Sequence, residues 1–93
     1  MFPKNEILLY RAIVRKIIKC YYDRNEIGIK KEINSKLHRW ILRNLNNEDI
    51  DEKVKYLNDL KMGITLKVKN DFIQIYYGTE SNYCDLGEVT LNQ

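Results

Sequence analysis

Residues that bind metals or form disulfides are scarce in this chain of 93 residues, which has two cysteines and one histidine. Cys20 and Cys84 lie far apart, no Cys-X-X-Cys pair occurs, and His38 is the one further candidate ligand of this kind. A structural zinc or iron–sulfur site needs about four convergent ligands, most of them closely spaced. We therefore expect the chain to bind no metal.

Long hydrophobic runs are also missing. The chain has no stretch of about 18 consecutive apolar residues, the length that a membrane-spanning helix needs. Residues 1–10 carry neither the apolar segment nor the small-residue cleavage site of a secretory signal. We therefore expect no membrane span, and a location inside a cell or an organelle.

A catalytic constellation cannot be assembled from the sequence. Cys20 continues an amphipathic segment and is most simply a semi-buried apolar residue, whereas Cys84 lies in a polar region as a free thiol. His38 sits among Leu37, Arg39 and Trp40, and the sequence places no serine, cysteine or carboxylate with it in the geometry of a catalytic triad. The expectation is a protein that is not an enzyme, with His38 at the surface or in an interface.

The charged residues are distributed unevenly along the chain. Residues 1–45 contain 11 Lys or Arg and 4 Asp or Glu, a net charge of +7, whereas residues 46–93 contain 5 and 9, a net charge of −4. This division predicts a basic surface for an acidic partner, with nucleic acid and anionic membrane as competitors. The alternative is that the two halves pair with each other.

Apolar residues recur at three- and four-residue steps and predict three helices. The first stripe covers residues 7–21, and the second covers residues 29–45. An asparagine cap and an acidic first turn at residues 46–51 mark the start of a third helix, which we expect to run to about residue 66. The three stripes predict an antiparallel three-helix bundle.

The last third of the chain is ambiguous. Residues 64–68 and 72–77 alternate between apolar and polar, which fits a short hairpin as well as a fraying helix followed by an extended segment. Because an isolated hairpin needs a surface to lie on, we favour the second alternative. The expected fold is therefore all-α, with residues 1–68 as the bundle and residues 69–93 as an extended or partly disordered C-terminal tail.

Basic residues form a ridge on each of the first two predicted helices, at about 100° per residue. Two such ridges on adjacent helices predict a cradle for an acidic helix, and the alternative is a solvated charged face. An apolar flank at Leu9 and Ile13, expected to be exposed, favours the partner. The ridge residues are Arg11, Arg15 and Lys19 on the first helix, and Lys36, Arg39 and Arg43 on the second.

The Leu9-Tyr10-Arg11 triplet, followed by Arg15, Trp40 and Gly63, resembles the LYR-motif proteins, the complex I LYR superfamily of small mitochondrial adaptors. The resemblance covers roughly residues 6–66 and implies a three-helix bundle in the mitochondrial matrix that binds acyl carrier protein. By this resemblance Leu9, Tyr10 and Arg11 form the LYR motif, with Tyr10 inside and Arg11 on the carrier protein. Lys61 is a departure, because it falls in the third apolar stripe.

The resemblance also implies which residues would meet the carrier protein and its acyl chain. The six ridge residues would bind the carrier, and the acyl chain on its 4′-phosphopantetheine would enter the bundle core, with no cofactor bound directly. The same core positions would be plain packing in an ordinary bundle. They are Tyr10, Val14, Ile17, Ile33, Leu37, Trp40, Val54 and Leu57.

Among LYR proteins, the length and the first helix look most like the accessory subunit of the mitochondrial cysteine desulfurase. The resemblance then implies an adaptor in iron–sulfur cluster assembly that stabilises this client by mass action. Alternative clients are a respiratory complex and the mitochondrial ribosome. A nucleic-acid-binding helical module is the competing class, with Tyr21, Tyr22 and Trp40 for stacking, but no recognition motif supports it and we expect no nucleic acid partner.

Overall fold

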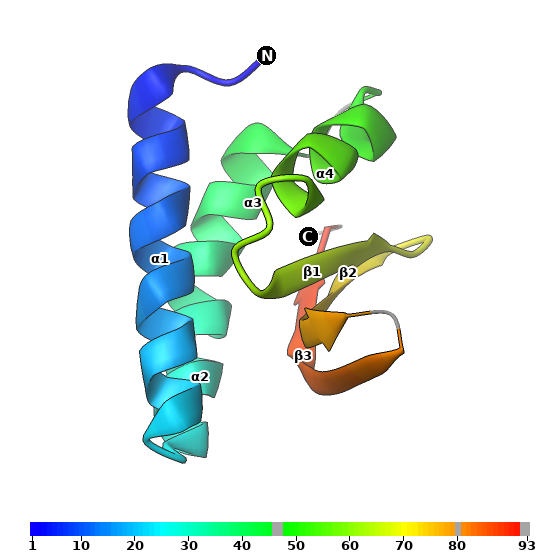
Figure 1. Ribbon diagram of the computed structural model, residues 1–93. Helices are drawn as coiled ribbons and strands as arrows, with labels where there is room; N and C mark the ends of the chain where they lie inside the picture. Colours follow the sequence, from blue (N-terminus) through cyan, green and yellow to red (C-terminus); the bar gives the residue numbers. More distant parts are fainter. Residues whose placement is uncertain (46–47, 80, 92–93) are drawn as a thin grey trace.

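The computed structural model describes residues 1–45, 48–79 and 81–91, and in them a layer of helices packs on one face of a three-stranded antiparallel sheet (Figure 1). The helices come first along the chain and the strands follow. The helical segments are α1 (Lys4–Tyr22), α2 (Glu26–Glu32), η1 (Ile33–Leu37), α3 (His38–Asn44) and α4 (Ile50–Asn58), and the strands are β1 (Ile64–Val68), β2 (Phe72–Thr79) and β3 (Asn82–Thr90).

The expected all-α bundle is therefore wrong. The third helix stops at Asn58, and the backbone then takes left-handed conformations at Lys61, with φ of 55°, and at Gly63, with φ of 99°. A right-handed helix cannot continue through such residues. The alternating residues that follow form β1 instead of a last helical turn.

The first predicted helix is confirmed, since α1 ends at Tyr22. Its buried residues recur at helical spacing from Tyr10 to Cys20. One flank of this helix differs from the expectation, because Leu9 is 42% exposed whereas Ile13 is 3% exposed and belongs to the core. None of the helices in the described ranges is long and apolar enough to cross a membrane.

The second predicted helix is also present, as one continuous helix made of α2, η1 and α3. Asn25 caps its start, because its Oδ1 accepts a hydrogen bond from the backbone N–H of Gly28 at 2.9 Å. Its middle, η1, is a π-helical segment, where the Ser35 hydroxyl donates to the Lys31 carbonyl at 2.6 Å. The hydrogen bonds of such a segment span five residues instead of the four of an α-helix, which widens the turn.

The two long helices form an antiparallel hairpin that is fastened at both ends. At one end the indole Nε1–H of Trp40 donates to the backbone carbonyl of Glu6 at 2.9 Å. At the other end the backbone of Gly28 approaches Cys20 closely, since a Cβ atom added at Gly28 would lie 2.8 Å from the Cys20 sulfur. The small residue there allows the close approach of the helices.

The sheet is a meander in the order β1-β2-β3. Its inner face carries Leu66, Ile73, Ile75 and Val89, all buried against the helical layer. The helices thus supply the surface that a hairpin at residues 64–77 requires. The weaker alternative from the sequence, the hairpin, is the one that the protein adopts.

The expected C-terminal tail is wrong as well. β3 pairs with β2 along its whole length, with a bulge between Ile75 and Tyr76, and it buries Leu86 and Val89. The boundary expected between residues 68 and 69 falls in the turn that joins β1 to β2. The last third of the chain is therefore part of the same core.

The outer edge of β1 is covered at its centre by a side chain from the end of α4. The Asn58 side-chain amide donates to the carbonyl of Leu66 at 3.0 Å, and its oxygen accepts from the N–H of Leu66 at 2.8 Å. The amide thus makes the two hydrogen bonds that a neighbouring strand would make. This arrangement, here called the Asn58 clasp, protects one edge of the sheet.

Candidate functional site

The surface of α1 that points away from the other elements is the best candidate for a binding site. α1 lies along one side of the molecule, and its other side packs against the rest (Figure 1). Two leucines are exposed near its start, Leu8 by 58% and Leu9 by 42%. We call this surface the outer face of α1; it consists of Leu8, Leu9, Arg11, Ala12, Arg15, Lys16 and Lys19.

The Leu9-Tyr10-Arg11 triplet divides between the core and this surface. Tyr10 is buried, with its ring 4.8 Å from that of Trp40, and burial raises the pKa of its hydroxyl. Arg11 is half-buried and Leu9 is exposed. The inward Tyr10 and the more exposed Arg11 agree with the orientations expected from the helical periodicity.

The basic residues of the outer face are largely free of acidic neighbours. Arg11 and Arg15 form no ion pair with any residue in the described ranges. Lys19 lies 3.0 Å from Asp23, and the hydrogen bond and charge of that carboxylate raise the pKa of Lys19. Both partners are exposed, so the pair contributes little and the face keeps a positive potential.

The second expected ridge lies elsewhere around α1. Lys36 and Arg39 are exposed on the second helix, and Arg43 forms an ion pair with Glu6 of α1 at 2.9 Å. Glu6 precedes Arg11 by five residues, which places the two about 140° apart around the α1 axis. The ridge of the second helix therefore approaches α1 on a different side from Arg11, and the two ridges do not form the expected single cradle.

Glu6 ties the start of α1 to the end of the second helix. Its carboxylate accepts hydrogen bonds from Asn44 at 2.6 Å and from Arg43 at 2.9 Å. The bond from Asn44, followed by the bond and charge of Arg43, holds the pKa of Glu6 below its ordinary value of 4.5. The ionised carboxylate is thus favoured in the folded state.

This lowered pKa predicts a pH dependence of stability. A carboxyl with a lower pKa in the folded state stabilises above its unfolded pKa of 4.5, and the contribution disappears as the pH falls through the folded value. We expect Glu6→Gln to lower the melting temperature at pH 7. Between pH 5 and pH 3 the melting temperature of this variant should fall less than that of the parent, by about the amount lost at pH 7. The control is Glu52→Gln, at an exposed position of α4. Equal acid profiles for the two variants would contradict the prediction.

The eight residues expected to line the core or an acyl chain are all buried. They share one cluster with strand residues such as Ile73 and Ile75, which fill its other side. Entry of an acyl chain into this cluster stays a prediction.

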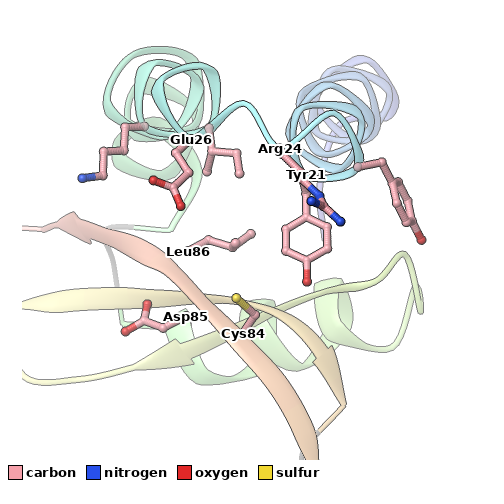
Figure 2. Close-up of a pocket in the computed structure, with 9 residues that line it drawn as sticks. Tyr21, Arg24, Glu26, Cys84, Asp85 and Leu86 are labelled. Carbon is pink, nitrogen blue, oxygen red and sulfur yellow. The ribbon is translucent and has the colours of Figure 1, made fainter.

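A pocket that the sequence did not indicate lies between the α1–α2 turn and β3 (Figure 2). Its volume is about 670 Å³. Arg24 stands at the turn in a left-handed conformation, with φ of 56°. The two sides come from segments that are about 60 residues apart, so no local sequence signal could have found it. The lining residues are Tyr21, Tyr22, Arg24, Glu26, Ile29, Lys30, Cys84, Asp85 and Leu86.

Three tyrosines fasten the end of α1 to β2 beside this pocket. The hydroxyl groups of Tyr22 and Tyr77 share a hydrogen bond of 2.6 Å, which, together with burial, raises the pKa of Tyr77. The rings of Tyr21 and Tyr77 lie 4.4 Å apart. The stacking set expected for a nucleic-acid module is therefore not available as a whole, because Trp40 is fully buried and Tyr21 already packs against a ring.

Cys20 is buried and Cys84 is exposed, and both are free thiols. Histidine, cysteine and carboxylate side chains do not gather in threes anywhere in the described ranges. No protein family model matches the chain, and no curated protein or solved structure matches it significantly.

Proposed function

We propose that the chain is an adaptor that binds an acidic helix of a partner protein on the outer face of α1. One observation carries the proposal: exposed Leu8 and Leu9 lie near Arg15, which forms no ion pair with a described residue, on the side of α1 that carries none of its buried residues. Scattered single apolar residues are ordinary on a surface, but two adjacent leucines beside a basic cluster are typical of an interface.

The chemistry of the face fits a helical partner. Leu8, Leu9 and Ala12 lie toward the start of α1, and Arg15, Lys16 and Lys19 follow one turn later. An amphipathic helix with a short apolar stretch next to carboxylates would bury the leucines and pair with the cations. The apolar contact would supply affinity, and the charges would steer association and set the register.

Acyl carrier protein is the partner that we propose, and the cysteine desulfurase of the mitochondrial matrix is the client. Support comes from the Leu9-Tyr10-Arg11 triplet, which resembles the LYR motif, and from the exposed basic residues after it. A respiratory complex and the mitochondrial ribosome are alternative clients. The resemblance extends less far than residue 66, since Gly63 precedes a strand and does not lie in a third helix.

A charge-reversal experiment tests this proposal. The variant carries Arg15→Glu and Lys19→Glu, and the control carries Lys67→Glu and Lys69→Glu, two exposed lysines at the other side of the fold. Binding of purified acyl carrier protein, acylated and unacylated, is measured by calorimetry. We expect the α1 variant to bind about tenfold more weakly or worse, and the control to bind almost as the parent does.

Two outcomes would count against the adaptor. Equal losses in the two variants would indicate attraction by net charge alone. Binding of nonspecific duplex DNA that persists at salt concentrations where binding of the carrier protein is lost would favour the nucleic-acid module. The affinity of such a module for DNA falls with salt in proportion to the number of phosphates it contacts.

A further inference from the structure

We propose that the free edge of β3 binds an extended basic segment of a partner protein, which adds a fourth strand to the sheet. This inference does not depend on the proposed role of α1, because it concerns the opposite layer of the fold. It starts from a difference between the two edges of the sheet. The β1 edge carries the Asn58 clasp, whereas the β3 edge has no such cover among the described residues.

The register of the strands identifies the backbone groups that are available on β3. Val89 pairs with Ile73, and the N–H of Leu91 donates to the carbonyl of Asp71 at 2.8 Å, so these residues of β3 turn their backbone groups toward β2. Backbone direction alternates along a strand, and Glu88 and Thr90 therefore turn theirs outward. Within the described ranges no backbone hydrogen bond reaches these outward groups.

The charge beside this edge selects the partner. Asp85 and Glu88 are exposed on the outer face of the sheet, and neither forms an ion pair with a described residue. Asp85 is held in place, because it accepts hydrogen bonds from the Gln74 side chain at 2.8 Å and from the N–H of Gly87 at 2.9 Å. Lysine or arginine on the same face of an added strand would lie beside these carboxylates.

The other face of the edge borders the pocket, where apolar side chains lie next to the charged Arg24, Glu26 and Lys30. Figure 2 shows Cys84 and Leu86 reaching into the pocket below the helices, while Asp85 lies on the other side of β3. Ile29 and Tyr21 line the same pocket from above. A strand that pairs with β3 would therefore place alternate side chains toward this pocket, where Ile29 and Leu86 offer apolar contact.

The bulge in β3 limits how far the pairing extends. Two residues of β3, Asp85 and Leu86, occupy the place opposite Tyr76 of β2, so the ladder is irregular at that point. We expect the added strand to pair with Glu88 and Thr90 and to direct one apolar side chain into the pocket beyond. The segment that fits alternates basic and apolar residues, as in peptides that bind by strand addition.

The test uses a fluorescent peptide of about eight residues that alternates lysine and valine, the length of an ordinary strand. Binding to the full chain is followed by fluorescence anisotropy, and hydrogen exchange of the amides is followed by nuclear magnetic resonance. We expect exchange at Glu88 and Thr90 to slow by about tenfold or more in the saturated complex, because these amides gain hydrogen-bond partners.

Two controls separate strand addition from charge attraction. The same peptide with every backbone nitrogen of its central residues methylated keeps its charge but loses its donors along both edges, and should not bind. Glu88→Lys should weaken binding about tenfold, whereas Glu52→Lys, on α4, should leave it unchanged. The α1 variant with Arg15→Glu and Lys19→Glu should bind the peptide as the parent does, so that failure here is distinguishable from failure of the adaptor proposal.

Three results would overturn the inference. One is equal binding of the methylated peptide, and another is protection that appears away from Glu88 and Thr90. The third is slow exchange at these amides without peptide, together with a dimer in sedimentation, since a second copy of the chain would then occupy the edge.

Discussion

Replacing Trp40 with alanine is expected to lower the free energy of unfolding by about 3–5 kcal/mol. The indole is fully buried, its ring lies 4.8 Å from that of Tyr10 and 5.6 Å from that of Phe2, and its N–H donates to Glu6. A domain of this kind has about 5–15 kcal/mol in total, so the variant should be largely unfolded well below the parent's melting temperature. Urea denaturation followed by circular dichroism measures the loss.

Trp40→Phe is the matched control for this prediction. It keeps an aromatic ring in the cluster but leaves the Glu6 carbonyl without its indole donor. We expect this variant to lose about 1–3 kcal/mol, clearly less than the alanine variant. A loss below about 1 kcal/mol in Trp40→Ala would mean that the aromatic cluster does not hold the two long helices together.

Removing the Asn58 clasp should have the second largest effect. Asn58→Ala leaves both the N–H and the carbonyl of Leu66 without their side-chain partner, and we expect a loss of about 1–3 kcal/mol in urea denaturation. The exposed β1 edge should then pair with other chains, so the variant should also self-associate in sedimentation.

The control for the clasp is Asn34→Ala, at an exposed position of the second helix. The Asn34 side chain makes no hydrogen bond with another described residue. This variant should therefore stay monomeric, with a free energy of unfolding close to that of the parent. If Asn58→Ala behaved like this control, water would replace the clasp without cost.

The helices could be predicted where periodicity alone decides the structure. The first two apolar stripes gave α1 and the second helix, because a buried residue at every third or fourth position has no other regular solution. The third stripe misled, since Ile64 fits a helical step from Leu57 as well as the alternation of a strand. Lys61 was the available signal, and it marks the place where the helix has already ended.

The periodicity of apolar residues could not predict the sheet. β3 has few large apolar residues, with Leu86 and Val89 as its buried ones, and it reads locally as a polar tail. What makes it a strand is the inner face of β2 and the helical layer beneath, which lie far away in the sequence. The outer face of α1 follows from one helix and could be foreseen, whereas the pocket and the β3 edge depend on contacts between distant segments.

The π-helical segment η1 has a consequence for how the chain tolerates insertion and deletion. The widened turn takes up one extra residue, so the helix faces before and after η1 are related as they would be in a regular α-helix one residue shorter. Deleting the exposed Asn34 should leave a regular α-helix whose flanking faces keep their orientation. A relative with such a helix would align to this chain through a gap of a single residue within η1, and a comparison that forbids this gap would misalign every core position after it.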